Sequence, residues 1–90
     1  MAYSVEVTPQ VQKIITKLGR QDRASQQSIK TFLEERIQGC DDPRYLGTAL
    51  RGDQYLWRYR VGDYRLLCSI DDHRVTVLVV DLAHRREVYR

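Results

Sequence analysis

The chain is short of cysteine and of long apolar segments, and each of these two shortages argues against a class of protein. Its 90 residues include two cysteines and two prolines. Cys40 and Cys68 are far apart and have no metal-ligand spacing with His73 or His84, so no metal site is expected. Because no secretory segment precedes them, we expect reduced thiols and a cytoplasmic protein. The longest apolar run, Val75–Val80 with Thr76 inside it, is far too short to cross a membrane, so no membrane partner is expected.

Lysine is also scarce, since arginine outnumbers it by 12 to 3 and the formal net charge is +3. The planar guanidinium fork matches phosphate and carboxylate groups, so this excess indicates recognition of such groups, although genomic base composition also enriches arginine. The 42% hydrophobic and 30% charged residues are typical of a globular chain and not of a disordered one. At this length we expect a single domain over residues 1–90 with a thin core.

The apolar pattern predicts an α+β fold with the element order β-α-α-β-β-β. Thr8-Pro9 is a helix-start signal, and the helix that follows is expected to end at Gly19. A second helix should run from near Asp22 to Gln38 and end at Gly39. The remaining pattern predicts four strands, at residues 2–7, 55–61, 64–70 and 75–81. We expect a mostly antiparallel four-stranded sheet packed against two N-terminal helices.

Two segments show little periodicity. Residues 39–54 hold four glycine or proline breakers and predict a long connector. Residues 82–90 form a short charged segment, for which at most one helical turn is expected.

Three arginines lie on the two strands joined by Gly62-Asp63. Alternation places Arg58 and Arg60 on one face of their strand, opposite to the aromatic residues that are expected to face the core. A two-residue loop would place Arg60 directly opposite Arg65. Like charges paired across a sheet are destabilising, so this pair requires a compensating acid or an anionic ligand.

The face that carries these arginines is also expected to be partly apolar. If the turn at 71–74 is tight, Ile70 lies opposite Val75. The arginine-bearing face then holds three apolar residues, Leu67, Leu78 and Val80. Apolar neighbours strengthen the attraction of a cation for phosphate, because they lower the local dielectric. The alternative is an ordinary solvated face, which explains Arg58 well but explains the Arg60–Arg65 opposition less well.

Four motifs spread over nearly the whole chain occur together. They are A-Y-S-V-E-V-T-P at the start, L-R-G at 50–52, W-R-Y-R-V-G-D-Y-R-L-L at 57–67 and H-R-R-E-V-Y at 84–89. In this combination the chain resembles the toxins of the RelE/ParE superfamily, the toxin halves of bacterial toxin–antitoxin pairs. The RelE-like branch is the more similar one.

The resemblance implies an endonuclease that cuts mRNA in the ribosomal A site and is silenced by a cognate antitoxin protein. It implies attack of a ribose 2′-hydroxyl on the adjacent phosphate, without a metal ion or another cofactor. Such a reaction needs a base, cations that stabilise the crowded phosphate, and an acid for the leaving 5′-oxygen. By resemblance, the catalytic positions are Arg58, Arg60, Arg65, Arg85 and Tyr89.

The chain departs from the best-known RelE pattern, in which the first two of these positions are lysines. Arg58 and Arg60 stay protonated, so they suit charge stabilisation and substrate positioning and not proton removal. Tyr89, made more acidic by Arg85, is the first candidate for proton transfer. His84, whose ordinary pKa is about 6.5, is the second. The sequence leaves this choice open. The segment before Tyr89 and the turn between the two arginine-bearing strands are also shorter than in that pattern.

Contacts with ribosomal RNA are expected from the two helices, because one small basic patch binds RNA weakly at physiological salt. The candidate residues are Lys13, Lys17, Arg20, Arg23 and Lys30. An ordinary solvated helix face is an equal alternative for them. Arg51, in the L-R-G motif, either contacts RNA or is structural, and a structural role is favoured.

Two other functions fit the same motifs. A ParE-like toxin that binds and poisons DNA gyrase would use the same fold without nuclease activity. The terminal H-R-R-E-V-Y and the double arginine favour phosphate cleavage over gyrase binding. The third possibility is an inactive chain that serves as a regulatory partner of its antitoxin. The antitoxin is expected to wrap the domain with an extended segment and a helix, and to neutralise the basic face with acidic residues.

Overall fold

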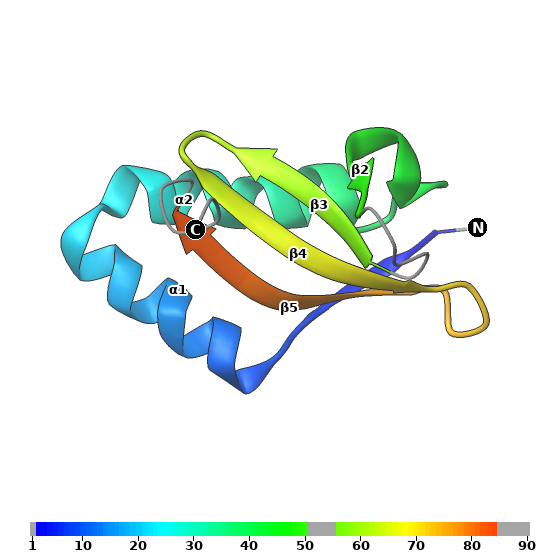
Figure 1. The fold of residues 1–90 in the computed structure, drawn as a ribbon, viewed down its shortest axis with the longest axis horizontal. Coiled ribbons are helices and arrows are strands. Elements are labelled where there is room, and N and C mark those ends of the chain that lie inside the picture. Colours follow the sequence, from blue (N-terminus) through cyan, green and yellow to red (C-terminus); the bar gives the residue numbers. More distant parts are fainter. Residues whose placement is uncertain (1, 51–55, 85–90) are drawn as a thin grey trace.

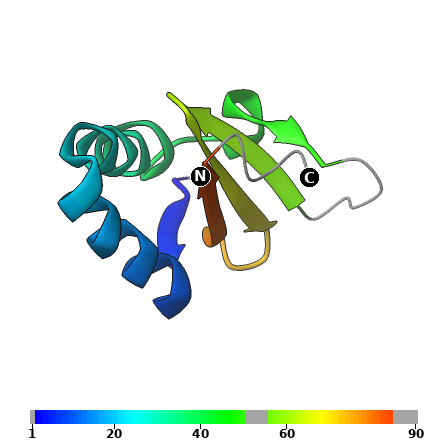
Figure 2. The ribbon, with the colours of Figure 1, turned by 60° about the vertical axis from the view of Figure 1, so that its left-hand side comes forward.

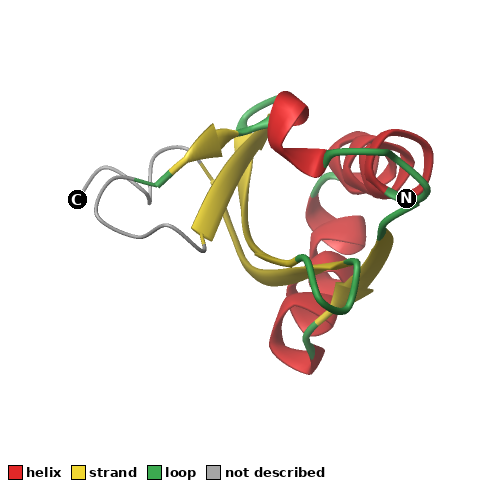
Figure 3. Ribbon diagram, turned by 90° about the vertical axis from the view of Figure 1, so that its right-hand side faces the viewer, coloured by secondary structure: helices red, strands yellow, loops and turns green. Residues whose placement is uncertain are grey.

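In the computed structural model, which describes residues 2–50 and 56–84, helices cover one face of a five-stranded sheet (Figure 1, Figure 3). The strand order is β1-β5-β4-β3-β2, with β1 parallel to β5 and every other pair antiparallel. The strands are β1 (Ser4–Val7), β2 (Thr48–Ala49), β3 (Leu56–Val61), β4 (Tyr64–Asp71) and β5 (Thr76–His84). The predicted α+β class is confirmed, but the sheet has five strands and not four.

The fifth strand, β2, lies within the segment that the sequence predicts to be a connector. Thr48 pairs with Arg58, and Ala49 pairs with Trp57. Two residues are too few to leave an alternating pattern, so the sequence gives no sign of this strand. Gly47 precedes it, and a Cβ there would meet the Tyr59 ring at 2.7 Å. Only glycine allows the connector to approach β3 this closely. Figure 2 shows the helices of residues 9–37 and β2 on opposite sides of the fold.

The first helix, α1 (Pro9–Gln21), begins as the sequence predicts. The hydroxyl of Thr8 accepts a hydrogen bond from the backbone N–H of Val11 at 3.3 Å, and proline occupies the first turn. The residues that α1 buries against the sheet are Val11, Ile15 and Leu18. The prediction that the helix ends at Gly19 is wrong, because α1 continues for two more residues.

Gly19 serves close packing instead of helix termination. A Cβ at Gly19 would overlap the side chain of Gln26, whose Nε2 donates a hydrogen bond to the carbonyl oxygen of Ile15 at 2.9 Å. The glycine therefore lets the second helix rest directly on the first.

The second helical segment starts and ends where the sequence predicts. The carboxylate of Asp22 accepts the backbone N–H of Ser25 at 3.1 Å and caps α2 (Arg23–Thr31). A π-helical turn, η1 (Phe32–Ile37), continues it, and Gly39 follows with φ of 83°, a conformation that glycine adopts readily.

The turn between β4 and β5 is longer than predicted. Ile70 pairs with Val77 and not with Val75. The carboxylate of Asp71 accepts the backbone N–H groups of His73 at 3.0 Å and Arg74 at 3.2 Å, which stabilises the wider turn. Strand β5 then runs to residue 84, so the part of the 82–90 segment that the structure describes is strand and not helical turn.

The core lies between the sheet and the helices. Its fully buried large side chains include Tyr59, Ile29, Ile37 and Leu66. The Tyr59 hydroxyl donates a hydrogen bond to the carbonyl oxygen of Pro43, at 2.8 Å, in the 3-10 helix η2 (Pro43–Leu46). Within the described ranges, no helix is long and apolar enough to cross a membrane.

The outer edge of β1 is occupied by polar contacts. The backbone N–H of Val5 donates to the side-chain oxygen of Gln38 at 2.8 Å. The N–H of Tyr3 donates to the carbonyl of Cys40 at 2.9 Å, and the carbonyl of Tyr3 accepts the N–H of Gly39 at 2.7 Å.

Candidate functional site

The hairpin of β3 and β4 places Arg60 directly opposite Arg65, which confirms the predicted register. Val61 pairs with Tyr64 across the two-residue turn, and Gly62 has φ of 59°. Glycine adopts this left-handed conformation without steric cost, so a tight hairpin turn is possible here. The turn geometry thus fixes the like-charged pair.

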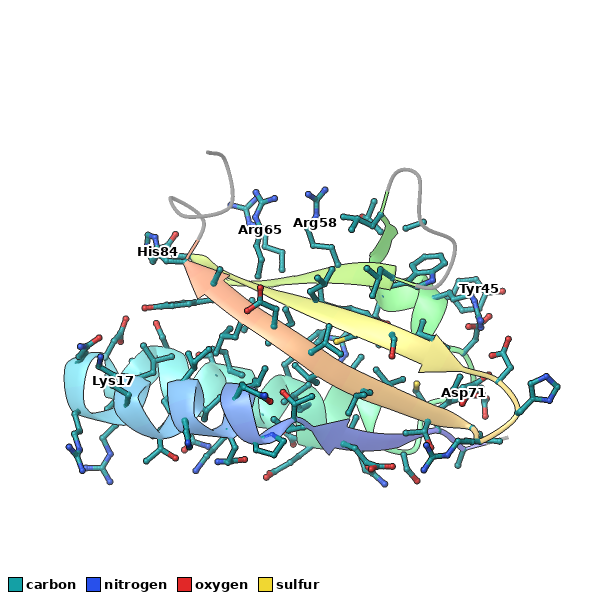
Figure 4. All side chains as sticks on the ribbon, turned by 60° about the horizontal axis from the view of Figure 1, so that its bottom comes forward. Lys17, Tyr45, Arg58, Arg65, Asp71 and His84 are labelled. Atoms are coloured by element: carbon teal, nitrogen blue, oxygen red, sulfur yellow. The ribbon has the colours of Figure 1, made fainter. Side chains whose placement is uncertain are left out.

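The arginines lie on the side of the sheet that the helices leave uncovered. Figure 4 shows Arg58 and Arg65 pointing away from the helices. Strand pairing extends this surface over β2 to β5. We call it the arginine face and define it by Thr48, Arg58, Arg60, Arg65, Leu67, Leu78 and Asp81.

One row of the arginine face crosses four strands. Thr48 pairs with Arg58, Arg58 with Leu67, and Leu67 with Asp81. The predicted positions of Leu67 and Leu78 on this face are confirmed. Asp81 is a residue that sequence reasoning missed. It reaches the face through a β-bulge, in which Val80 is the extra residue between the Cys68–Val79 and Leu67–Asp81 pairs.

Two cations of this face, Arg58 and Arg60, have few partners among the described residues. Among the described residues, neither Arg58 nor Arg60 forms an ion pair, and the Nε of Arg60 donates a long hydrogen bond of 3.4 Å to the carbonyl oxygen of Gly62. The Nε of Arg65 is shielded from solvent. No carboxylate of the described chain neutralises Arg58 or Arg60, so both guanidinium groups are available to a bound anion.

A different arginine, Arg44, has the opposite surroundings. Its guanidinium contacts Asp72 at 2.8 Å and Asp42 at 3.4 Å, and it lies 6.0 Å from the centre of the Trp57 ring. The Tyr3 hydroxyl donates to Asp72 at 2.6 Å. This hydrogen bond and the one from Arg44 lower the pKa of Asp72. Arg44 is therefore a structural cation that joins η2 to the β4–β5 turn.

His84 lies on the opposite face of the sheet from the arginines. It pairs with Tyr64, and the two rings contact edge to face with centroids 5.1 Å apart. Both residues line a groove with Lys17 of α1. The pKa of Asp22 is lowered mainly by hydrogen bonds from Ser25 and also by the charge of His84. The structure thus places His84 in a groove beside α1, on the other face of the sheet from Arg60 and Arg65.

The basic residues of the helices are exposed and also lie away from the arginine face. Lys13, Lys17 and Arg20 follow each other at spacings of four and three along α1, so they share one stripe. Figure 4 shows Lys17 on the helical side of the molecule. Arg23 begins α2, and Lys30 lines a groove that also contains Glu34. The structure therefore separates a helical cation surface from the arginine face.

Three of the predicted site residues, Arg51, Arg85 and Tyr89, lie outside the described residues. In the part of the chain that the structure describes, no three histidine, cysteine or acidic side chains are close enough together to hold a metal ion. Cys68 is a buried thiol, and burial raises its pKa to about 12. Thiolate chemistry at neutral pH is therefore not expected at this position.

The sequence and the fold both match known toxins. A sequence model of the family described as the ParE toxin of the type II toxin–antitoxin system parDE matches residues 5–89. No curated protein sequence matches the chain.

Among solved structures, the chain is similar to the toxin–antitoxin complex RelBE2 from Mycobacterium tuberculosis, with a TM-score of 0.77 and 27% identity over 94% of this chain and 100% of that one. A substituted E. coli RelE toxin in the free state gives a TM-score of 0.73 and 27% identity over 99% and 92% of the two chains. The archaeal RelE–RelB complex from Pyrococcus horikoshii OT3 gives a TM-score of 0.63 and 26% identity over 94% of this chain and 97% of that one. The chain therefore belongs to the ParE toxin family of the RelE/ParE superfamily and is the toxin of a type II toxin–antitoxin system.

Proposed function

We propose that this toxin is a ribosome-dependent mRNA endonuclease of the RelE type, which inhibits translation. The observation that carries the proposal is the opposition of Arg60 and Arg65 on a face that the helices leave uncovered. Two guanidinium groups in this arrangement repel each other, and a bound phosphodiester removes the repulsion. A surface that served only solubility would not require charges of one sign to face each other.

The three arginines have roles that follow from their permanent charge. Arg60 and Arg65 hold the scissile phosphate and stabilise the negative charge that develops during attack by the 2′-hydroxyl. Arg58, one row away, positions the neighbouring part of the RNA backbone. Arg85 and Tyr89 follow β5, and the resemblance assigns them charge stabilisation and protonation of the leaving 5′-oxygen. The position of His84 on the other face does not support it as the proton donor.

The helical cation surface suits ribosomal RNA. The stripe of Lys13, Lys17 and Arg20 is exposed and lies on α1, on the helical side of the molecule. Each phosphate that it neutralises releases condensed counterions and adds affinity at physiological salt. A toxin bound by this surface would leave the arginine face open to the message. Arg51 remains assigned to a structural role in its motif.

The partner of the toxin is proposed to be a RelB-type antitoxin. The similar structures from M. tuberculosis and P. horikoshii are complexes of a RelE toxin with its antitoxin. An antitoxin segment with acidic side chains would complement the arginine face and prevent RNA from binding there.

A ParE-like action on DNA gyrase is the second candidate. It is favoured by one observation, the match of residues 5–89 to the ParE family. A gyrase-binding toxin would need a complementary surface but no phosphate-cleaving group.

Primer extension on a translated message tests the proposal. Induction of the toxin should arrest growth and produce cuts within codons of translated mRNA, and replacement of both opposed arginines (Arg60→Ala with Arg65→Ala) should abolish the cuts. Arg74→Ala, an exposed arginine in the β4–β5 turn, is the matched control and should cut like the wild type. Uncut messages with accumulated gyrase–DNA cleavage complexes would replace this proposal with the gyrase alternative.

A further inference from the structure

Asp81 places a carboxylate on the arginine face. The resemblance to RelE toxins assigns no role to this residue. Its side chain is exposed, and one of its oxygens accepts the backbone N–H of Leu82 at 2.8 Å. Among the described residues it forms no ion pair, although Arg58 stands in the same row. The carboxylate therefore keeps acceptor capacity for a ligand.

The bulge in β5 is what turns Asp81 outward. Val77 and Val79 both face the core, and strict alternation would place residue 81 there as well. Burial of an unpaired carboxylate is costly. Because Val80 is the extra residue, Leu82 takes the core position and Asp81 pairs with Leu67 on the arginine face. Bulges commonly redirect side chains beside active sites.

The row places a cation and a carboxylate on either side of one strand. Arg58 and Asp81 both flank Leu67, so their backbones are two strand spacings apart, about 10 Å. Both side chains extend from the same face toward solvent. An RNA backbone lying across Leu67 would contact a guanidinium group on one side and a carboxylate on the other.

We propose that Asp81 is the general base of RNA cleavage, a role that rests on the proposed nuclease function. Its carboxylate takes the proton of the ribose 2′-hydroxyl, and the 2′-oxygen forms a bond to the adjacent phosphorus. The bond from phosphorus to the 5′-oxygen breaks, and a separate acid protonates that oxygen. The products are a 2′,3′-cyclic phosphate and a 5′-hydroxyl end. The arginines stabilise charge in this step but cannot accept the proton.

The groups that surround Asp81 are defined on each neighbouring strand. Arg58 and Arg60 lie on the same face on β3. On β4, Asp81 pairs with the uncharged Leu67, and Arg65 follows two residues away, opposite Ala83. His84, on its own strand, lies on the other face. Arg85 and Tyr89 lie outside the described residues.

Single-turnover cleavage of a translated message on ribosomes, at saturating toxin, tests this role. Asp81→Asn should lower the rate about 10²-fold or more, while the toxin concentration for half-saturation stays unchanged. Asparagine keeps an oxygen for the Leu82 N–H, so the thermal unfolding midpoint should not change. Asp41→Asn, at an exposed aspartate of the connector, is the matched control and should cut at the wild-type rate.

The pH dependence separates a base from a residue that only positions Arg58. In the wild type the rate should fall as the pH is lowered, because a protonated carboxylate accepts no proton. This acid limb should be absent in Asp81→Asn and present in Asp81→Glu, which should recover part of the rate. Wild-type cleavage rates in Asp81→Asn, or an unchanged acid limb, would overturn the role of Asp81 alone. A wild-type toxin that arrests growth without cutting any message would overturn both proposals.

Discussion

The two faces of the sheet are made from alternate residues of the same strands, and they differ in what neutralises or covers them. Leu66 is fully buried under the helices, whereas its neighbour Leu67 lies on the arginine face and is only half-buried. On the covered face, the buried Tyr59 hydroxyl donates its hydrogen bond within the protein, to the Pro43 carbonyl oxygen. The arginine face instead leaves Arg58 and Arg60 without an internal carboxylate partner among the described residues. One face thus maintains the fold, while the other presents charge on an uncovered surface.

The two leucines provide the largest expected contrast. Leu66→Ala should lower the free energy of unfolding by about 2–5 kcal/mol, because it opens a cavity in a thin core. Leu67→Ala should cost less than about 1 kcal/mol, because its side chain is half in solvent. Urea unfolding followed by circular dichroism measures both. Equal losses would show that the arginine face is also a packed surface.

The opposed arginines should show a smaller effect of the opposite sign. Arg60→Glu converts a repulsive cross-strand pair into an attractive one and should raise the free energy of unfolding by about 0.5–1 kcal/mol. The same variant should lose toxicity, because the guanidinium that we propose to bind phosphate is gone. The gain should shrink as salt is added, since exposed charges are screened. A destabilised Arg60→Glu protein would mean that the pair is already compensated in the free toxin.

The Arg44 cluster should give the smallest and most pH-dependent effect. The folded-state pKa of Asp72 lies below its ordinary value of 3.8, so its contribution is present above pH 3.8 and is lost as the pH falls through the lower folded value. Asp72→Asn should therefore flatten the acid side of the plot of thermal midpoint against pH. Some acid sensitivity should remain, because the pKa of Asp22 is also lowered. An unchanged slope would show that Arg44 and Tyr3 do not hold this carboxylate in solution.

The sequence predicted the part of the site that a tight turn controls. Two residues between β3 and β4 leave a single register, so the opposition of Arg60 and Arg65 followed from chain length alone. The position of Asp81 did not follow. The run from Val77 to Val80 is entirely apolar, so it gives no alternation from which to detect an extra residue.

The sequence did not predict the face on which His84 lies, for a related reason. The prediction ended β5 at residue 81, but the strand continues and carries His84 to the helical side. Strand ends depend on pairing with distant residues, here Tyr64, and local sequence holds little information about them. The two-residue strand β2 was not predicted for the same reason, because it too is defined by pairing with distant residues.

The occupied edge of β1 has a consequence for how the toxin behaves in solution. An unprotected edge strand can pair with a strand of another copy of the chain, and this pairing leads to aggregation. Gln38 already bonds the N–H of Val5, and the backbone at residues 39–40 already bonds the N–H and the carbonyl of Tyr3. A second molecule would have to displace these bonds before it could join the sheet. The fold therefore resists polymerisation at this edge without relying on a partner protein to shield it.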